Sequence, residues 1–578
     1  MTKNIEVADI LDKIGDTLEV LEENPFKVRA YRNAARNIRD LAENIEDIAA
    51  RGELTEIQGI GADIAAKIMQ YLATGRIEEY ERLKKKVPES CIELLGIQGL
   101  GPKTLALLYR ELGVRNLPDL ERALEGEEIL RLPRMGAKKV EDIKRGVKQY
   151  KERSGRIPLG IALPLAEDIV AAIKEIPGVS KIAIAGSIRR RRETIRDIDI
   201  LTVSEDGARV IKRFTTLPFV KDVLLAGDTK SSIVTKSGIQ VDLRVVDGDS
   251  WGGALQYFTG SMAHNVKLRT IAIKKGYNLS EYGIFRGEEK VIGESEEGIY
   301  ECLGLKWIPP ELREDRGEIE AALKCTLPQL VAIEDIRGDL HCHSHWSDGR
   351  DSVEEMASAA KNMGYEYVAI TDHSVSATIA KGLTVERLGE LRKEVEAARE
   401  KIKGISILLG AEVDIKGDGT LDFPDDVLKG LDIVLVAIHS GFKSDKEAMT
   451  KRVVKALQHP YVHAFVHPTG RLIGQREPYE IDMDEVMKTA KKYGKALEVN
   501  AHYLRLDLND INIKKAIGMG IKIVISTDAH STDQLRLMRY GVDTARRGWA
   551  RREDVVNTLS YGELKKWLSS VRSGTIHE

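Results

Sequence analysis

The sequence has few of the features that secreted, membrane and chromatin proteins need. Its four cysteines form no Cys-x-x-Cys pair, so neither a disulfide framework nor a thiolate zinc site is expected. No apolar run approaches the roughly 18 residues of a membrane helix, and Met1 to Glu6 lack a secretory hydrophobic core. The net charge of −3 excludes a uniformly basic protein. We therefore expect a globular, cytoplasmic chain of about three or four domains.

Histidine is almost absent from the first half of the chain. Only His264 precedes residue 335, and the other eleven of the twelve histidines follow it. Because imidazole is a common metal ligand, this skew predicts two halves with different chemistry, the second with a histidine-rich metal site.

Three carboxylates form the first candidate site. Asp197 and Asp199 stand at the start of a strand-like segment that continues to Val203, where alternate residues share a face. Asp242 lies in the strand-like segment 239–246, which could pair alongside. Three converging carboxylates can hold two divalent cations, which activate a hydroxyl and stabilise a leaving phosphate oxygen. The pattern therefore predicts metal-dependent phosphoryl chemistry.

A short basic loop precedes these carboxylates. The apolar strand 181–185 leads into Gly186 and Ser187, whose backbone N–H groups and hydroxyl can hold a phosphate at the strand end. Gly-Ser followed by Asp-x-Asp resembles the nucleotidyltransferase superfamily.

A repeated motif precedes this region. The order apolar, any residue, Gly, apolar, Gly precedes predicted helices at 62–72 and 102–112, and a degenerate copy with Arg134 in place of the first glycine precedes a helix at 137–146. It resembles the helix-hairpin-helix motif, which binds nucleic-acid backbone without reading sequence. Ten basic and three acidic residues between Arg131 and Arg156 suit the same role. The predicted DNA-binding glycines are Gly59, Gly61, Gly99, Gly101 and Gly136.

The N-terminal region resembles the corresponding domain of family X DNA polymerases, typified by DNA polymerase beta. The resemblance rests on the segment 26–32, on Gly-Ile-Gly at 59–61 and on the helix that follows. It implies that Lys27 binds phosphate and that Lys67 is the candidate Schiff-base residue of a deoxyribose-phosphate lyase. Asp63 stands where lyase members carry a lysine, and a carboxylate there opposes the lowered pKa that such chemistry needs.

The resemblance to family X continues through the polymerase core. It implies that Asp197, Asp199 and Asp242 bind metal, that Asp242 helps activate the primer 3′-hydroxyl, and that Arg269 contacts the template side. Tyr-Phe-Thr-Gly-Ser at 257–261 matches the start of the family's thumb, where the aromatic pair packs against the incoming sugar. The nucleotide-binding positions that it implies are Gly186, Ser187, Arg190, Arg244, Tyr257, Phe258, Gly260 and Asn265.

The last third alternates between strands and helices. We expect a distorted barrel of seven β/α units, with strands at 338–342, 366–371, 405–413, 431–438, 462–467, 496–499 and 522–527. Nine candidate ligands lie at or after the carboxyl ends of these strands, enough for two or three metals: His341, His343, Asp348, His373, Glu412, His439, His467, Asp528 and His530. The series resembles the polymerase-and-histidinol-phosphatase (PHP) domain. No metal role is assigned to the histidines outside the family positions, namely His345, His459, His463, His502 and His577.

The PHP resemblance implies phosphoesterase chemistry. Joined to a polymerase, such a domain would act on DNA as a 3′–5′ exonuclease, a 3′-phosphatase or an abasic-site endonuclease. Arg471 and Lys443 lie in predicted loops on the same rim and are expected to contact the DNA backbone.

The predicted fold is multidomain. It comprises a helical helix-hairpin-helix region (1–80 and 81–155), an α/β nucleotidyltransferase palm (156–245), a thumb (246–312), a linker (313–335) and a C-terminal PHP barrel (336–578).

The predicted function is gap-filling DNA synthesis in repair, including base excision repair, with end-cleaning by the PHP domain. The expected cofactors are Mg²⁺ or Mn²⁺ at the polymerase site and Zn²⁺, Mn²⁺ or both at the PHP site. The expected partners are gapped or nicked DNA and deoxynucleoside triphosphates, with no membrane, and the protein is expected to be a monomer. Two alternatives stay open: a DNA 3′-end nuclease whose polymerase half positions DNA, and a PHP domain that is structural or acts on small phosphates. A non-enzymatic DNA-binding protein is the least favoured interpretation, because it would leave both metal sites unexplained.

Overall fold

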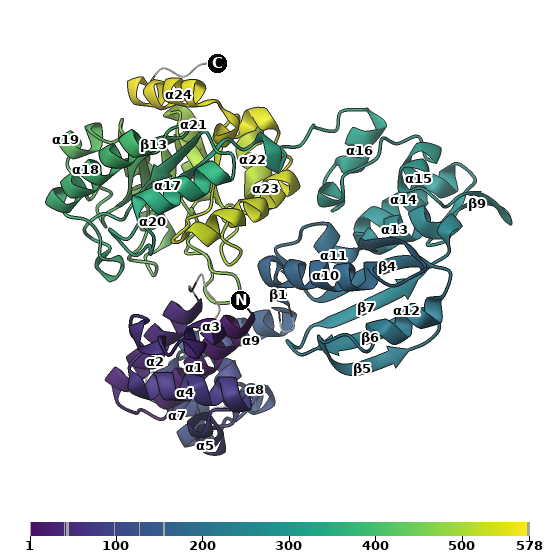
Figure 1. Ribbon diagram of the computed structural model, residues 1–578, viewed down its shortest axis with the longest axis horizontal. Helices are drawn as coiled ribbons and strands as arrows, with labels where there is room; N and C mark the ends of the chain where they lie inside the picture. Colours follow the sequence, from purple (N-terminus) through teal and green to yellow (C-terminus); the bar gives the residue numbers. More distant parts are fainter. Residues whose placement is uncertain are drawn as a thin grey trace. The chain divides into compact units, whose positions relative to one another are not determined.

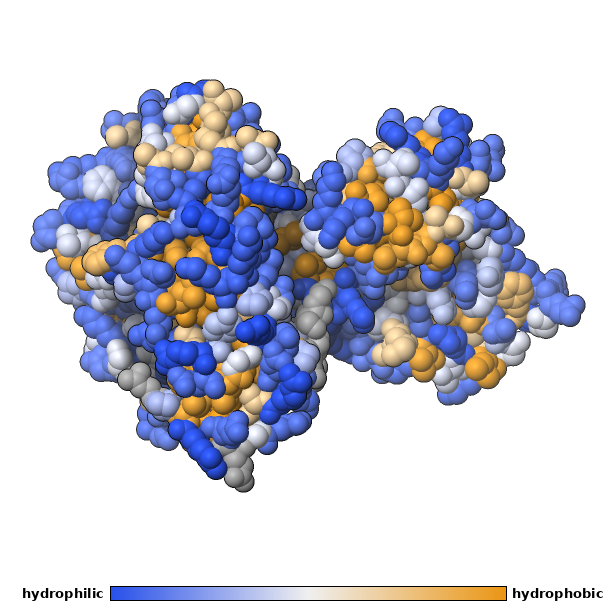
Figure 2. All heavy atoms as spheres, turned by 90° about the horizontal axis from the view of Figure 1, so that it is seen from below, coloured by the Kyte–Doolittle hydropathy of each residue, from blue (hydrophilic) through white to orange (hydrophobic). Residues whose placement is uncertain are grey.

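The computed structural model describes residues 2–39, 41, 45–97, 99–126, 128–133, 135–153 and 156–574. The chain forms two compact units, one of Met1–Ser154 with Gly474–Glu477 and the other of Gly155–Ile473 with Pro478–Glu578 (Figure 1). Among the described residues, no helix combines the length and apolarity needed to cross a membrane. On the face in Figure 2, hydrophilic side chains predominate and apolar ones form separate patches, because most large apolar side chains pack inside the domains.

The first unit is helical and contains the three helices predicted after the repeated motif. Gly59 and Gly99 have φ of 81° and 88°, values that favour glycine, so each motif turns sharply before its helix. The third helix is longer than predicted, and Gln98 and Arg134 of the motifs lie outside the described residues. The helices are α1 (Thr2–Val20), α2 (Pro25–Arg39), α3 (Ile45–Ala50), α4 (Ala62–Thr74), α5 (Glu78–Lys86), α6 (Glu89–Ile92), α7 (Pro102–Leu112), α8 (Leu117–Glu125) and α9 (Ala137–Arg153).

A five-stranded sheet forms the palm region of the second unit, in the order β2-β4-β7-β6-β5. Two helices, α10 (Leu159–Lys174) and α12 (Gly207–Phe214), bury apolar side chains in its core. The loop predicted after the first strand instead begins as a short helix, α11 (Gly186–Arg189), followed by β3 (Thr194–Ile195), which pairs with β1 (Ile157–Pro158). The strands of the sheet are β2 (Val179–Ile184), β4 (Asp197–Ser204), β5 (Val220–Ala226), β6 (Lys230–Thr235) and β7 (Gln240–Val245).

The thumb region combines helices with a three-stranded sheet. Part of the predicted linker 313–335 belongs to the core of this region, because Ile319 and Ala322 of α16 (Glu318–Leu323) pack in one cluster with Leu268 and Tyr300. The first half of that stretch is therefore packed rather than extended. The other thumb elements are α13 (Trp251–Thr259), α14 (Met262–Lys274), β8 (Asn278–Ser280), β9 (Gly283–Arg286), β10 (Glu289–Ile292) and α15 (Glu296–Cys302).

The predicted seven-stranded barrel is confirmed. Its strands are parallel and follow chain order, and a bridge between Cys342 and Ala529 joins its first strand to the residues after its last. The strands are β11 (Gly338–Cys342), β12 (Tyr367–Ile370), β13 (Ser406–Asp414), β14 (Ile433–Ala437), β15 (Ala464–Phe465), β16 (Ala496–Asn500) and β17 (Ile523–Ser526).

Helices surround these strands in Figure 1. Most of them contribute to one apolar cluster with the outward-facing strand residues, for example Leu391 with Leu409. They are α17 (Val353–Asn362), α18 (Val385–Lys401), α19 (Asp425–Lys429), α20 (Lys446–Leu457), α21 (Met483–Lys492), α22 (Asp510–Gly518), α23 (Met538–Arg547) and α24 (Tyr561–Ser573).

Candidate active sites

The three palm carboxylates lie together on two adjacent strands. β4 and β7 run parallel with Asp199 opposite Asp242, and Asp197 lies two residues earlier on the same face as Asp199. Burial raises the pKa of Asp199 to about 7, and the charges of the other two carboxylates add to the rise. Because this repulsion would be relieved by a cation, the donor set fits divalent metal ions.

Asp242 is held by neighbours that the sequence did not reveal. Its carboxylate accepts hydrogen bonds from the Ser232 hydroxyl on β6 and from Gln240 Nε2, the latter at 3.2 Å. Alternation along β7 could have indicated Gln240, which lies two residues before Asp242, but Ser232 comes from a different strand.

The predicted phosphate-binding turn lies against these carboxylates. Gly186 has φ of 63°, and a Cβ atom there would lie 2.2 Å from Asp199 Oδ2, so only glycine fits. Arg190, at the end of α11, donates from Nη1 to the carbonyl of Thr259 at 2.5 Å and from Nε to Glu314 at 3.1 Å. The structure therefore places the turn between the carboxylates and the thumb.

The aromatic pair at the start of the thumb is flanked by arginines. The rings of Tyr257 and Phe258 lie 5.1 Å apart, with Arg244 4.4 Å from the Phe258 ring and Arg269 5.8 Å from the Tyr257 ring. Asn265 is buried and donates to the Tyr257 carbonyl at 2.8 Å. Its amide thus fixes the backbone of this pair, and a direct nucleotide contact by Asn265 stays a prediction.

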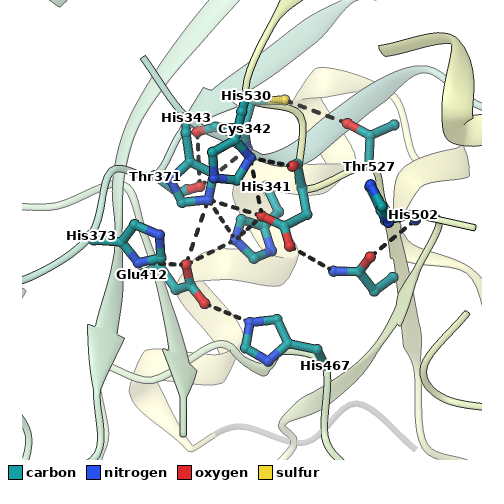
Figure 3. A network of polar contacts seen from close by, with 12 residues as sticks. His341, Cys342, His343, Thr371, His373, Glu412, His467, His502, Thr527 and His530 are labelled. Carbon is teal, nitrogen blue, oxygen red and sulfur yellow. Dashed lines mark hydrogen bonds and ion pairs between the residues drawn. The ribbon is translucent and has the colours of Figure 1, made fainter. Parts of the chain in front are cut away.

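The candidate ligands of the barrel converge on one centre (Figure 3). Glu412 lies in the middle of the histidines, because five imidazole nitrogens lie within 3.5 Å of its carboxylate oxygens. His343 Nδ1 and Glu412 Oε2 are buried without a hydrogen-bond partner, as expected of atoms that bind a cation. Eight of the nine predicted ligands form three overlapping groups with mutual ligand-atom distances within 4.8 Å: His343, Asp348, His373 and His530; His341, His343, Glu412 and Asp528; and His373, Glu412 and His439.

The ninth predicted ligand is also close. His467 Nε2 lies 2.7 Å from Glu412 Oε1, although His467 is in none of the three groups. Burial lowers the pKa of His343 to about 3, with help from the charges of His530 and His373. A neutral imidazole has a free lone pair, so His343 is in the form that binds metal.

A second layer of polar side chains orients the ligands. Glu498 contacts His341 Nδ1 at 2.7 Å and accepts a hydrogen bond from the His467 backbone at 2.6 Å. Asp414 contacts His439 Nδ1 at 3.1 Å. Sequence reasoning missed both acids. An acidic residue inside or at the end of an otherwise apolar strand, as Glu498 and Asp414 are, could have indicated them.

The two predicted DNA contacts on the barrel rim differ in their surroundings. Arg471 is partly buried, with its guanidinium bound to the Arg505 carbonyl at 2.8 Å and to Glu193 at 2.8 Å. Lys443 is exposed. Arg471 is thus paired with the palm residue Glu193, and a DNA contact by either Arg471 or Lys443 stays a prediction.

The candidate lyase lysine lies among carboxylates. Lys67 Nζ is 2.5 Å from Asp63 and 3.1 Å from Glu79, and Lys27 Nζ is 2.7 Å from the same Glu79. Tyr31 also donates to Glu79 at 2.8 Å. Lys27, the predicted phosphate-binding residue, and Lys67, the candidate lyase residue, are thus both in ion pairs, and sequence reasoning did not identify Glu79 as their partner.

Family models cover most of the chain. They describe a helix-hairpin-helix domain at residues 2–77, a SAM-like helix-hairpin-helix tandem at 92–149, a DNA polymerase beta thumb at 254–314 and a PHP domain at 339–504.

Individual relatives match different lengths of the chain. A DNA polymerase/3′-5′ exonuclease PolX of Bacillus subtilis (strain 168) is 39% identical over 568 residues, which are 97% of this chain and 99% of the relative. A probable phosphatase of Thermoanaerobacter sp. (strain X514) is 30% identical over 241 residues, 40% of this chain and 93% of the relative. DNA polymerase lambda of Arabidopsis thaliana is 26% identical over 299 residues, 45% of this chain and 53% of the relative. Since the first of these similarities spans nearly the whole of both chains, the chain belongs to the PolX family, the family X DNA polymerase/3′-5′ exonucleases with a C-terminal PHP domain.

Proposed function

We propose that the protein extends DNA 3′ ends across short gaps during repair and that its PHP domain removes nucleotides from such ends. The observation that carries this proposal is the presence of two separate ligand clusters in one chain. One is the carboxylate group on β4 and β7, and the other is the imidazole and carboxylate centre of the barrel. Each suits divalent cations, but their ligand chemistry differs.

In the palm, Asp197, Asp199 and Asp242 would bind Mg²⁺ or Mn²⁺. Such cations activate the primer 3′-hydroxyl and neutralise charge on the reacting phosphate. The backbone of Gly186 would approach the triphosphate of the incoming deoxynucleotide, because α11 begins there and its first N–H groups have no partner within the helix. Ser232 would keep the Asp242 carboxylate oriented toward the same point.

In the barrel, the nine ligands would hold two or three Zn²⁺ or Mn²⁺ ions. Such cations lower the pKa of water toward about 7 and withdraw charge from a phosphodiester. Glu412 would hold such ions together with the imidazoles that contact its two oxygens. We propose 3′–5′ exonuclease activity as the main reaction, with 3′-phosphatase and abasic-site endonuclease activities as further reactions of the same centre.

The helix-hairpin-helix regions, 1–80 and 81–155, would bind the DNA backbone on the two sides of a gap. α4 and α7 begin directly after Gly61 and Gly101, where backbone N–H groups can bind phosphate. We further propose that the palm (156–245), thumb (246–312) and PHP domain (336–578) act within a monomer.

The test uses a 5′-labelled primer in a one-nucleotide gap with Mn²⁺, with and without deoxynucleotides. We expect the wild type to extend the primer with nucleotides and to shorten it without them. Asp242→Ala should lose extension and keep shortening, and His341→Ala should do the reverse, because each change removes a ligand from one cluster only.

The matched controls are Asp222→Ala and His459→Ala, which alter exposed or partly exposed residues outside both clusters and should keep both activities. Loss of both activities in Asp242→Ala would contradict two separate sites. Shortening without extension in the wild type would instead favour a DNA 3′-end nuclease whose palm only positions DNA.

A further inference from the structure

A buried arginine of the PHP domain binds the palm beside its predicted nucleotide-binding turn. Arg547, the last residue of α23, has a side chain only 4% exposed. Its Nη1 donates to the backbone carbonyl of Arg190 at 2.6 Å and to Glu314 at 3.1 Å, and its Nη2 donates to Asp510 at 2.6 Å. The guanidinium therefore fixes a backbone atom at the end of α11.

The contact is tied to the Arg190 side chain through a shared carboxylate. Glu314 Oε1 accepts from both Arg547 Nη1 and Arg190 Nε, each at 3.1 Å. Arg190 Nη1 in turn donates to the Thr259 carbonyl, one residue after the aromatic pair of the thumb. One arginine of the PHP domain is thus connected to the turn and to the start of the thumb.

The residues that follow Arg190 are also held by the PHP domain. Arg191 has φ of 55°, an unfavourable value for a residue with a side chain, and its Nε lies 3.4 Å from Asp543 on α23. Glu193 pairs with Arg471 at 2.8 Å. The path of the chain after α11 is therefore stabilised by side chains that a polymerase core alone does not contain.

We propose that Arg547 is a positioning residue for the incoming deoxynucleotide in the polymerase reaction. The proposal rests on the proposed function, in which Gly186, Ser187 and Arg190 hold the triphosphate. Without Arg547, the Arg190 carbonyl loses its charged donor and Glu314 keeps only palm partners, so α11 is less constrained. A less constrained turn binds triphosphate more weakly, whereas the carboxylates on β4 and β7 remain in place.

The test compares wild type, Arg547→Ala and Arg547→Lys in single-nucleotide gap filling at a series of deoxynucleotide concentrations. We expect Arg547→Ala to raise KM for the nucleotide about tenfold and to change kcat less than threefold, with cleavage by the PHP domain retained. Arg547→Lys should raise KM less than Arg547→Ala does, because one ammonium can replace one of the three contacts of the guanidinium. On gapped DNA with a dideoxy-terminated primer, which cannot be extended, nucleotide binding can be measured alone. Arg547→Ala should then need a higher nucleotide concentration than wild type to form the complex of protein, DNA and nucleotide.

Arg539→Ala is the matched control. Arg539 lies on the same helix and pairs with Glu167 of α10 at 3.2 Å, so its removal breaks another contact between the same two domains without touching α11. Glu314→Gln is the second variant, and it should reproduce the higher KM even if Arg547→Ala does not fold.

Three outcomes would overturn the proposal. They are an unchanged KM in both Arg547→Ala and Glu314→Gln, an equal rise in Arg539→Ala, and a fall in kcat alone. An absence of extension by the wild type would instead refute the proposed polymerase function, so the two failures are distinguishable.

Discussion

Replacing Glu498 by glutamine tests whether the second layer of polar side chains, which orients the ligands, sets the metal affinity of the barrel. Glu498 contacts His341 Nδ1 at 2.7 Å, which leaves Nε2 directed to the ligand cluster, and it also accepts the His467 backbone N–H at 2.6 Å. Glutamine has the same shape but no charge, and its single carbonyl oxygen can serve only one of these two contacts. Loss of such a partner typically weakens metal binding about 10- to 100-fold, or about 1.4–2.7 kcal/mol.

We expect Glu498→Gln to be at the lower end of this range, because one contact survives. The Mn²⁺ concentration for half-maximal exonuclease activity should rise about tenfold, and metal retained after dialysis should fall when measured by mass spectrometry. Gap filling with saturating Mg²⁺ should not change, since the palm carboxylates are separate.

The control is Glu447→Gln, the same chemical change at an exposed residue of α20 that pairs only with Lys451 among the contacts described. Equal metal retention in Glu498→Gln and wild type would refute the reasoning. So would an equal loss in Glu447→Gln, which would show that the removed charge acts at long range rather than through His341 and His467.

Three further predictions concern Glu79, Lys67 and the bound metals. Burial acts to raise the pKa of Glu79, but hydrogen bonds from Lys27, Tyr31 and Lys67 outweigh it and lower the pKa from 4.5 to about 2. Because the folded-state pKa is the lower one, the stabilisation is complete above pH 4.5 and is lost as the pH falls toward 2. Glu79→Gln should therefore lower the free energy of unfolding at pH 7, as measured by calorimetry, and differ little from wild type near pH 2. Borohydride should trap little covalent complex with abasic DNA in either wild type or Lys67→Ala, since Lys67 Nζ is engaged in ion pairs with two carboxylates; strong trapping in the wild type alone would contradict this. Prolonged dialysis against EDTA should abolish extension and shortening and lower the melting temperature, because the ligands of the barrel lose the cations that link them, and added Mn²⁺ should restore all three.

The strands and the candidate ligands could be predicted because both depend on local pattern. Segments of four to nine residues predicted all seven barrel strands, and ligands such as Glu412 and Asp528 lie in or just after them, as parallel strands require. The spacing of Asp197 and Asp199 likewise determined that they share a face. The pairing of residues across strands, such as Ser232 opposite Asp242, could not be predicted. It depends on which strands are neighbours in the sheet and on their register, and neither is encoded in a local pattern.

The partners of the predicted residues were harder to find than the residues themselves. Glu498 is 157 positions from His341, and Arg547 is 357 positions from Arg190, so no local periodicity links either pair.

Lys67 shows why partners that are distant in sequence matter for function. Its position matches that of a Schiff-base lysine, but the chemistry of an amine depends on the charges within a few ångströms. Asp63, one turn earlier on the same helix, could be recognised from the sequence, whereas Glu79 comes from the next helix and was not. Together they make this site a set of ion pairs rather than an open phosphate pocket. A motif therefore identifies which atoms are candidates for a reaction, while the contacts made in the folded chain determine whether those atoms are free to react.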